Sequence, residues 1–149
     1  MRIYLDLCVY NRPFDDHMQP RNFTETVQFL VLLEKAINKE ITLINSFALE
    51  EENRRNPFIN RMDKIGDLLN ASLEYVGYSK RLENRAKEIE KLGVMGMDAL
   101  HIACAEFVRA DFLVTCDDLL VRKGRTLGGK LRIRIINLME FVVKEVFKI

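Results

Sequence analysis

Three carboxylates in this chain closely follow short apolar runs of the kind that form buried strands. Asp6 comes directly after residues 2–5, and the pair Asp117 and Asp118 comes just after residues 112–115. In open parallel α/β sheets, functional groups gather beyond the carboxyl ends of the strands. We therefore expect these carboxylates to share one cleft.

Two more acids are expected at the same edge of the sheet. Glu50 lies in the first turn or two of the helix after a strand at residues 41–45, and Asp98 starts the helix that leads into the next strand. The register of the glutamate is open, because Glu51 and Glu52 adjoin it. One acid at such a place is most often a helix cap or a turn residue, so the hypothesis depends on their recurrence at strand ends.

A cleft that holds several carboxylates favours a divalent cation. The negative charges repel one another and raise one another's pKa. Mg²⁺ or Mn²⁺, which prefers carboxylate and water oxygens, relieves that repulsion. Such an ion can orient and deprotonate a water molecule and neutralise charge on a phosphate. The layout therefore predicts hydrolysis of phosphodiester bonds.

The helix that begins near Asp98 has one polar edge in an otherwise apolar segment. Four polar residues share an arc of roughly 140°, at about 100° per residue, namely Asp98, His101, Glu106 and Arg109. His101 could assist at the site, but a histidine on a largely buried helix is more often structural. The pattern therefore favours a structural role for His101.

Apolar periodicity predicts strands that alternate with helices along the whole chain. Strands are expected at residues 2–5, 41–45, 112–115 and 131–136. Helices are expected at residues 24–38, 47–53, 58–69, 80–92, 98–110, 117–123 and 138–147, with a Gly- and Arg-rich loop at 124–130 and residues 71–78 left open between helix and extended structure. This alternation implies a parallel sheet between helical layers. No linker-like stretch divides the chain, so one domain is expected over residues 1–149.

Four motifs occur along the chain in an order that is more specific than any one of them. They are Asp6 after the first strand, the step from Ser46 to Glu50, and the segments Met97–Ala103 and Leu113–Asp118. Together they resemble the motifs of the PIN-domain nucleases, and among these the sequence is most similar to the VapC-like toxins of prokaryotic toxin–antitoxin pairs. The resemblance spans nearly the whole chain.

This resemblance implies a PIN-like α/β fold with three layers, α/β/α, around a central and mostly parallel sheet. It implies Mg²⁺- or Mn²⁺-dependent cleavage of single-stranded RNA in the cytoplasm, with a small antitoxin protein and a second copy of the chain as partners. The family's catalytic and metal-binding acids map onto Asp6, Glu50, Asp98 and Asp117, supported by Thr115 and Asp118.

One position departs from the family pattern. Thr or Ser usually follows the first aspartate, whereas this chain has Leu7. A hydroxyl that would orient a carboxylate or a water is therefore absent, and the alternative hypothesis is a weakly active or inactive PIN-fold module that binds RNA or protein. An aspartyl-phosphate enzyme is a third possibility, but it would need an acid two residues after Asp6, where Cys8 stands.

Composition limits the classes of partner. The 149 residues carry a formal net charge of +1, so bulk charge indicates neither a nucleic acid nor a membrane. RNA contacts would depend on local groups, for which the candidates are Arg12, Arg122, Lys123 and Arg125. No apolar run approaches the roughly 20 residues that a membrane span needs. The three cysteines are widely spaced and suit a reducing cytoplasm.

Overall fold

The five strands of the protein form one parallel sheet with β1 at its centre. The computed structural model describes residues 1–149. The strands are β1 (Arg2–Leu5), β2 (Thr42–Ser46), β3 (Glu74–Val76), β4 (Phe112–Thr115) and β5 (Ile135–Asn137). Their order across the sheet is β3-β2-β1-β4-β5, and every pairing is parallel. The carboxyl ends of all strands therefore share one edge, as the sequence predicts.

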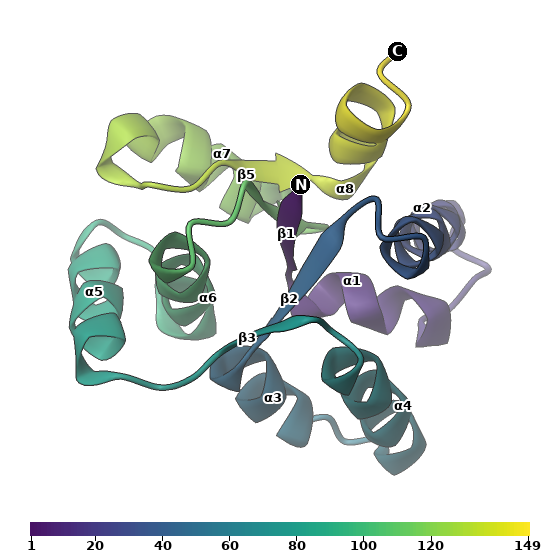
Figure 1. The fold of residues 1–149 in the computed structure, drawn as a ribbon, viewed down its shortest axis with the longest axis horizontal. Helices are drawn as coiled ribbons and strands as arrows, with labels where there is room; N and C mark the ends of the chain where they lie inside the picture. Colours follow the sequence, from purple (N-terminus) through teal and green to yellow (C-terminus); the bar gives the residue numbers. More distant parts are fainter.

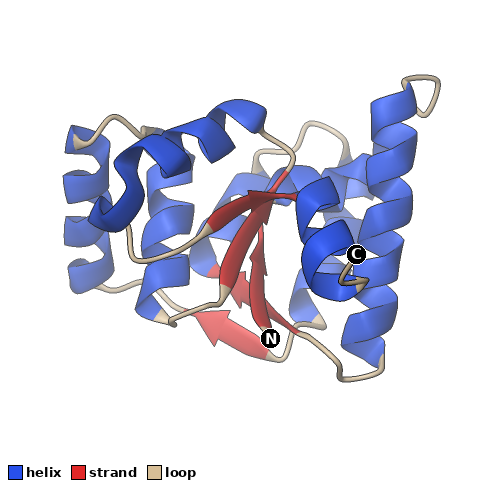
Figure 2. Ribbon diagram, turned by 90° about the horizontal axis from the view of Figure 1, so that it is seen from above, coloured by secondary structure: helices blue, strands red, loops and turns tan.

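Helices cover both faces of this sheet and complete the three layers. Figures 1 and 2 show α5 and α6 on one side of the strands and α2 with α8 on the other. The α-helices are α1 (Leu7–Asn11), α2 (Pro20–Ile37), α3 (Phe47–Arg54), α4 (Ile59–Asn70), α5 (Lys80–Lys91), α6 (Gly96–Phe107), α7 (Asp118–Leu127) and α8 (Leu138–Phe141). None combines the length and the apolar character that a membrane crossing requires.

The centre of the sheet is buried because helices lie against both of its faces. Every residue of β4 is buried, and so are Ile3, Tyr4 and Leu5 of β1. Strands that are buried on both faces are typically near-continuous apolar runs, as these two are. Their side chains belong to one continuous hydrophobic cluster. A closely packed layer therefore supports the edge where the acids lie.

The prediction of a loop at residues 124–130 is wrong. Helix α7 continues to Leu127, and Gly128–Lys130 then form a turn of 3₁₀ helix. The glycine content of this segment suggests a loop, but Gly124 lies inside α7. A Cβ at this position would lie 3.0 Å from Cδ1 of Ile135, so glycine lets the helix approach β5 closely.

The predicted strand at residues 131–136 is wrong in its extent. Only Ile135–Asn137 is regular strand, in parallel register with Leu113–Thr115. The alternating apolar and basic pattern therefore starts before the strand itself. The predicted helix at 138–147 is α-helical only to Phe141 and continues as a π-helical turn over Val142–Val146.

The other predicted elements are confirmed, most of them with shifted ends. The strand at residues 112–115 has the predicted bounds. Helix α2 begins earlier than predicted, at Pro20, because proline suits the first turn of a helix. A 3₁₀ turn at Arg12–Phe14 follows α1. The undecided segment 71–78 contains the edge strand β3.

Candidate metal centre at the carboxyl edge of the sheet

Asp6 lies at the junction of β1 and α1 and is held there by two hydrogen bonds. It is the N-cap of α1, and its Oδ1 accepts a hydrogen bond of 2.8 Å from the backbone N–H of Leu7. Its Oδ2 accepts a hydrogen bond of 2.8 Å from the hydroxyl of Thr115. The residue is only 7% exposed. The carboxylate is therefore fixed in one orientation at the end of the central strand.

Thr115 supplies an orienting hydroxyl that Leu7 does not. Leu7 is buried, and Thr115 reaches Asp6 from the neighbouring strand β4. The same hydroxyl accepts a hydrogen bond of 3.1 Å from the backbone N–H of Asp117. The thiol of Cys8 lies 3.4 Å from both Asp6 Oδ2 and Thr115 Oγ1. The hydroxyl of Thr115 therefore orients the carboxylate of Asp6, although no hydroxyl follows Asp6 in the sequence.

The three adjacent glutamates of α3 point to three different places. Glu52 faces α6, where its Oε1 lies 2.7 Å from Nε2 of His101. Glu51 pairs with Arg54 at 2.6 Å. Glu50, the glutamate chosen from the sequence, accepts a hydrogen bond of 3.3 Å from Asn45. Since successive residues of a helix point about 100° apart, a change of two residues in register decides which glutamate reaches the acids.

Three potential ligand atoms from three different elements come together at this edge. Asp6, Glu52 and His101 each offer one such atom, and these atoms all lie within 4.8 Å of one another. Nε2 of His101 is 3.9 Å from Oδ1 of Asp6. This cluster could hold a metal ion. Of the acids proposed from the sequence, Asp6 belongs to it, and the glutamate that joins it is Glu52.

His101 is almost fully buried and has both ring nitrogens occupied. Nδ1 lies 2.6 Å from the hydroxyl of Tyr4, and that hydroxyl lies 2.6 Å from Oγ of Ser46. Burial alone would lower the pKa of His101, but the hydrogen bond with Glu52 and the charge of Asp6 outweigh it and raise the pKa. The sequence pattern favours a structural role for His101, whereas the structure places its Nε2 close to Glu52 and Asp6. Its position three residues after Asp98 was the signal that could have placed it at the site.

Asp98 lies in the first turn of α6 and feels the other acids. Its pKa is raised to about 6, mainly because the carboxyl is partly buried and next because of the negative charge of Asp6. The charges of Asp117 and Glu52 raise it further, and only His101 acts in the opposite direction. This is the mutual repulsion expected of carboxylates that share a cleft. A cation bound among these carboxylates would relieve this repulsion.

Asp117 and Asp118 are neighbours in sequence but face different surroundings. Asp117 caps α7 by accepting hydrogen bonds from the N–H groups of Leu119 and Leu120. Asp118 is bound at 2.8 Å by Arg21, which lowers the pKa of its carboxyl. Asp117 therefore keeps a charge that raises the pKa of Asp98, whereas Asp118 is paired with an arginine.

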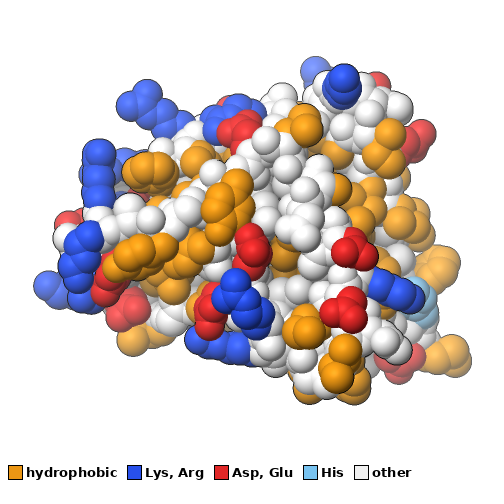
Figure 3. Space-filling model, turned by 60° about the horizontal axis from the view of Figure 1, so that its bottom comes forward, with side chains coloured by type: hydrophobic (Ala, Val, Ile, Leu, Met, Phe, Trp, Pro, Cys, Tyr) orange, Lys and Arg blue, Asp and Glu red, His pale blue; other side chains and the backbone are white.

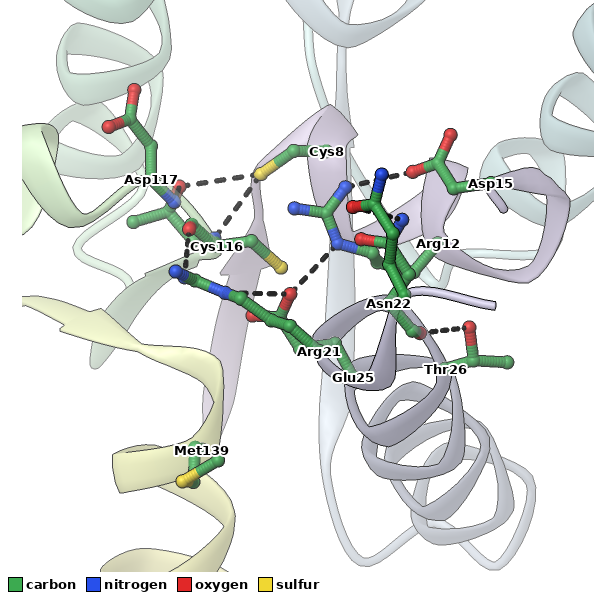
Figure 4. A network of polar contacts seen from close by, with 12 residues as sticks. Cys8, Arg12, Asp15, Arg21, Asn22, Glu25, Thr26, Cys116, Asp117 and Met139 are labelled. Carbon is green, nitrogen blue, oxygen red and sulfur yellow. Dashed lines mark hydrogen bonds and ion pairs between the residues drawn. The ribbon is translucent and has the colours of Figure 1, made fainter. Parts of the chain in front are cut away.

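The basic residues selected as RNA contacts differ in whether their side chains are already paired with an acid of the chain. Arg12 is bound to Glu25 and Asp15 in the network of Figure 4. Arg125 pairs with Glu140, and Lys123 contacts only the carbonyl of Gly93.

Arg122 has no ion pair. Figure 3 shows charged side chains of both signs on one face of the molecule, with several Lys and Arg side chains toward its left edge. Of the candidates for RNA contacts, Arg122 and Lys123 of α7 are the two that form no ion pair with an acid.

The parallel sheet, the helical layers and the carboxylates at one edge define a PIN-like α/β fold. Among solved structures, the chain is similar to the crystal structure of VapBC2 from Rickettsia felis bound to a DNA fragment from their promoter. The TM-score is 0.57 at 18% sequence identity, over 92% of this chain and 98% of that chain. No family model and no curated protein matches the sequence. The expected resemblance to VapC-like PIN domains is therefore confirmed as a likeness of fold.

Proposed function

We propose that this protein is a metal-dependent ribonuclease that hydrolyses phosphodiester bonds of single-stranded RNA. The observation that carries the proposal is the cluster of Asp6, Glu52 and His101, whose potential ligand atoms lie within 4.8 Å of one another. Asp98 lies beside it, with its pKa raised by burial and by Asp6. No lysine or arginine neutralises these acids in an ion pair. An acidic cleft of this kind suits a divalent cation.

The residues of the chain divide the work of such a centre. Asp6 and Glu52 offer carboxylate oxygens to Mg²⁺ or Mn²⁺, and Asp98 and Asp117 complete the pocket directly or through water. Thr115 holds the carboxylate of Asp6 in place. When bound, the ion supplies activation of a water molecule and neutralisation of charge on the phosphate. Glu50, which the resemblance suggested, is replaced by Glu52 in this proposal because of the direction in which each points.

The test is cleavage of a labelled single-stranded RNA by the purified protein with Mg²⁺, with Mn²⁺ and with EDTA. Cleavage that requires the metal and is lost in Asp98→Asn is expected. Glu52→Gln and Glu51→Gln form a matched pair, because Glu51 is paired with Arg54 on the surface. Only Glu52→Gln is expected to lose activity. Cleavage that persists in EDTA or in Asp98→Asn would contradict the proposal.

We further propose that the nuclease acts as a toxin and that a small antitoxin protein inhibits it. The support is the likeness of fold to VapBC2 together with the motifs of the sequence. Expression of the chain in bacteria is then expected to arrest growth, and expression of Asp98→Asn is not. Normal growth with the soluble parent protein would count against a toxin.

Exposed apolar side chains offer surfaces for a second copy of the chain and for an antitoxin. Phe23, Val27 and Leu30 of α2 are exposed, as are Phe58 and Ile59 at the start of α4. A dimer in solution is the expected result of light scattering. The mass of a single chain at micromolar concentration would contradict it.

The alternative function is a PIN-fold module that binds RNA or protein without cleaving it. Leu7, in place of a hydroxyl residue, favours this alternative. The hydrogen bond from Thr115 to Asp6 weakens it, because Asp6 is oriented without that hydroxyl. RNA binding that is the same in the parent and in Asp98→Asn, with no cleavage by either, would favour the module.

A further inference from the structure

We infer that His101 is itself a ligand of the metal ion, so that the centre is a mixed nitrogen and oxygen site that prefers first-row transition ions over Mg²⁺. The inference rests on the proposed function, because it concerns the ion that the nuclease would use. It goes beyond the resemblance, which assigns this role to carboxylates alone.

The first argument is the direction of the ring. Nε2 of His101 points toward both carboxylates, at 2.7 Å from Oε1 of Glu52 and 3.9 Å from Oδ1 of Asp6. Ligand atoms that each lie about 2.1 Å from one ion are roughly 3 to 4 Å apart. The 3.9 Å between Nε2 and Asp6 has the spacing of neighbouring ligands around one ion, whereas the 2.7 Å between Nε2 and Glu52 is a hydrogen-bond distance that an ion bound between them would lengthen.

The second argument is the environment of the other ring nitrogen. A histidine that binds a metal almost always donates its second N–H to a fixed partner. Nδ1 of His101 lies 2.6 Å from the hydroxyl of Tyr4, which lies 2.6 Å from Oγ of Ser46. A proton on Nδ1 can be donated to the Tyr4 oxygen, while Tyr4 donates its own proton to Ser46. In this tautomer Nε2 carries a lone pair in place of a proton, and it can bind an ion that replaces its present contact with Glu52.

The third argument is burial, which keeps the ring in this orientation. His101 is 1% exposed, and both Tyr4 and Ser46 are fully buried. The ring cannot swing toward solvent without breaking the packing of α6 against β1. Glu52 is the more exposed partner, with a third of its side chain accessible. An ion would therefore reach the nitrogen from the side of Glu52.

A different role for His101 uses the same contacts. With the proton on Nε2, the ring donates to Glu52 and only orients that carboxylate. His101 would then be a positioning residue, and every ligand from the chain would be an oxygen. The two roles differ in one observable, which is whether nitrogen is bound directly to the ion.

The two roles also predict different metal preferences. Imidazole nitrogen favours transition ions along the series from Mn²⁺ to Co²⁺ and beyond, whereas Mg²⁺ prefers oxygen. If His101 is a ligand, His101→Gln lowers the affinity for Mn²⁺ and Co²⁺ by about tenfold or more and changes that for Mg²⁺ by less than about threefold. Isothermal titration calorimetry of the full chain measures these affinities.

The decisive experiment is pulsed electron paramagnetic resonance of Mn²⁺ added to the full chain. Nitrogen bound to Mn²⁺ modulates the electron spin echo, and labelling histidine with ¹⁵N replaces the ¹⁴N pattern. The experiment uses the unmodified protein, so it does not depend on the folding of a variant. Histidine modulation that changes with the label is the expected result.

The only other histidine of the chain provides a matched control. His17 is exposed and lies 3.2 Å from both the carbonyl of Arg12 and the hydroxyl of Thr26. The modulation is expected to persist in His17→Gln and to disappear in His101→Gln.

The other outcomes overturn the inference and separate it from the proposed function. Bound Mn²⁺ without histidine modulation, together with metal-dependent RNA cleavage, would make His101 a positioning residue and leave the nuclease standing. Failure of Mn²⁺ to bind would contradict the inference that His101 is a metal ligand. The cleavage assay with Mg²⁺ then decides whether the nuclease also fails.

Discussion

Two clusters of charged side chains flank the ends of β1 and β4. The acids of one cluster are paired with arginines of the chain, and the acids of the other are not. In one, the buried Glu25 is bound by Arg12 at 2.9 Å and by Arg21 at 3.2 Å (Figure 4). In the other, Asp6 and Glu52 meet without any arginine or lysine. A buried acid that the chain pairs with its own cations ties elements together. Acids that the chain leaves without such cations make a place for a cation from solution.

The pair of acids after β4 divides between these clusters. Asp118 is bound by Arg21 and Asn137, and so belongs to the arginine cluster. The charge of Asp117 raises the pKa of Asp98, and Asp117 is therefore assigned to the proposed metal centre. Neighbouring residues of the same type thus have different roles, because the turn into α7 points their carboxylates in different directions. The comparison predicts opposite results for substitutions in the two clusters.

The largest expected effect is on catalysis in the metal centre. Loss of a partner that only orients a metal ligand reduces metal affinity or activity by about 10- to 100-fold, so loss of a direct ligand in Asp6→Asn is expected to reduce RNA cleavage by more than about a hundredfold. The rate of cleavage at saturating Mn²⁺ measures this. A variant that retains a tenth of the parent activity would remove Asp6 from the centre.

The largest expected effect on stability lies in the arginine cluster. Glu25→Ala leaves Arg12 partly buried without its main partner, and is expected to lower the free energy of unfolding by about 3 kcal/mol. Urea denaturation measures the loss, with Glu51→Ala as the exposed control. Mn²⁺ affinity is expected to stay unchanged. A loss below about 1 kcal/mol would contradict the difference between the two clusters, because Glu25 would then contribute little to the stability of the fold.

A smaller effect of opposite sign is expected at Asp98. The pKa of this carboxyl is about 6 in the folded protein against 3.8 ordinarily, so its ionised form destabilises the folded state above pH 6 and has no such effect below pH 3.8. Without metal, Asp98→Asn is therefore expected to be more stable than the parent near neutral pH, by on the order of 1 kcal/mol after allowance for solvent screening.

The gain at Asp98 is expected to vanish as the pH falls toward about 4. Urea denaturation in EDTA across this pH range tests the sign. A gain that does not depend on pH would mean that repulsion among the acids is not its cause.

The smallest effect is expected at Asp118. Its ion pair with Arg21 is exposed, so Asp118→Asn is expected to reduce stability by less than about 1 kcal/mol. It is also expected to reduce cleavage far less than Asp117→Asn does. RNA cleavage and urea denaturation of the two variants, measured in parallel, compare the roles of these adjacent acids. Equal losses of activity would place both acids in the metal centre.

The fold could be predicted from the sequence because its signals are local. The run Phe112–Thr115 is short and entirely apolar or β-branched, and such a run forms a buried parallel strand. Gly124 misled the prediction, because its reason is the close approach of β5, which comes later in the chain. The bounds of β5 likewise depend on which residues register with β4.

The candidate site could be predicted only in part, because side-chain direction depends on distant residues. The places of Asp6 and Asp98, at a strand end and a helix start, predict that both lie at this edge of the sheet. The choice between Glu50 and Glu52 depends on how α3 is rotated against α6, which no local pattern records. The role of His101 depends on Tyr4, and its contacts with Glu52 and Asp6 cross three elements. The pairing of Arg12 with Glu25 instead of a ligand is decided in the same way.

The hydrogen bond from Thr115 to Asp6 joins residues that are 109 positions apart in the chain. During synthesis on a ribosome, Asp6 emerges 109 residues before the partner that orients its carboxylate. A nascent chain shorter than this cannot assemble the acids at the edge of the sheet. Since domains fold as units, the acids come together only after the whole segment from Asp6 to Thr115 has been made.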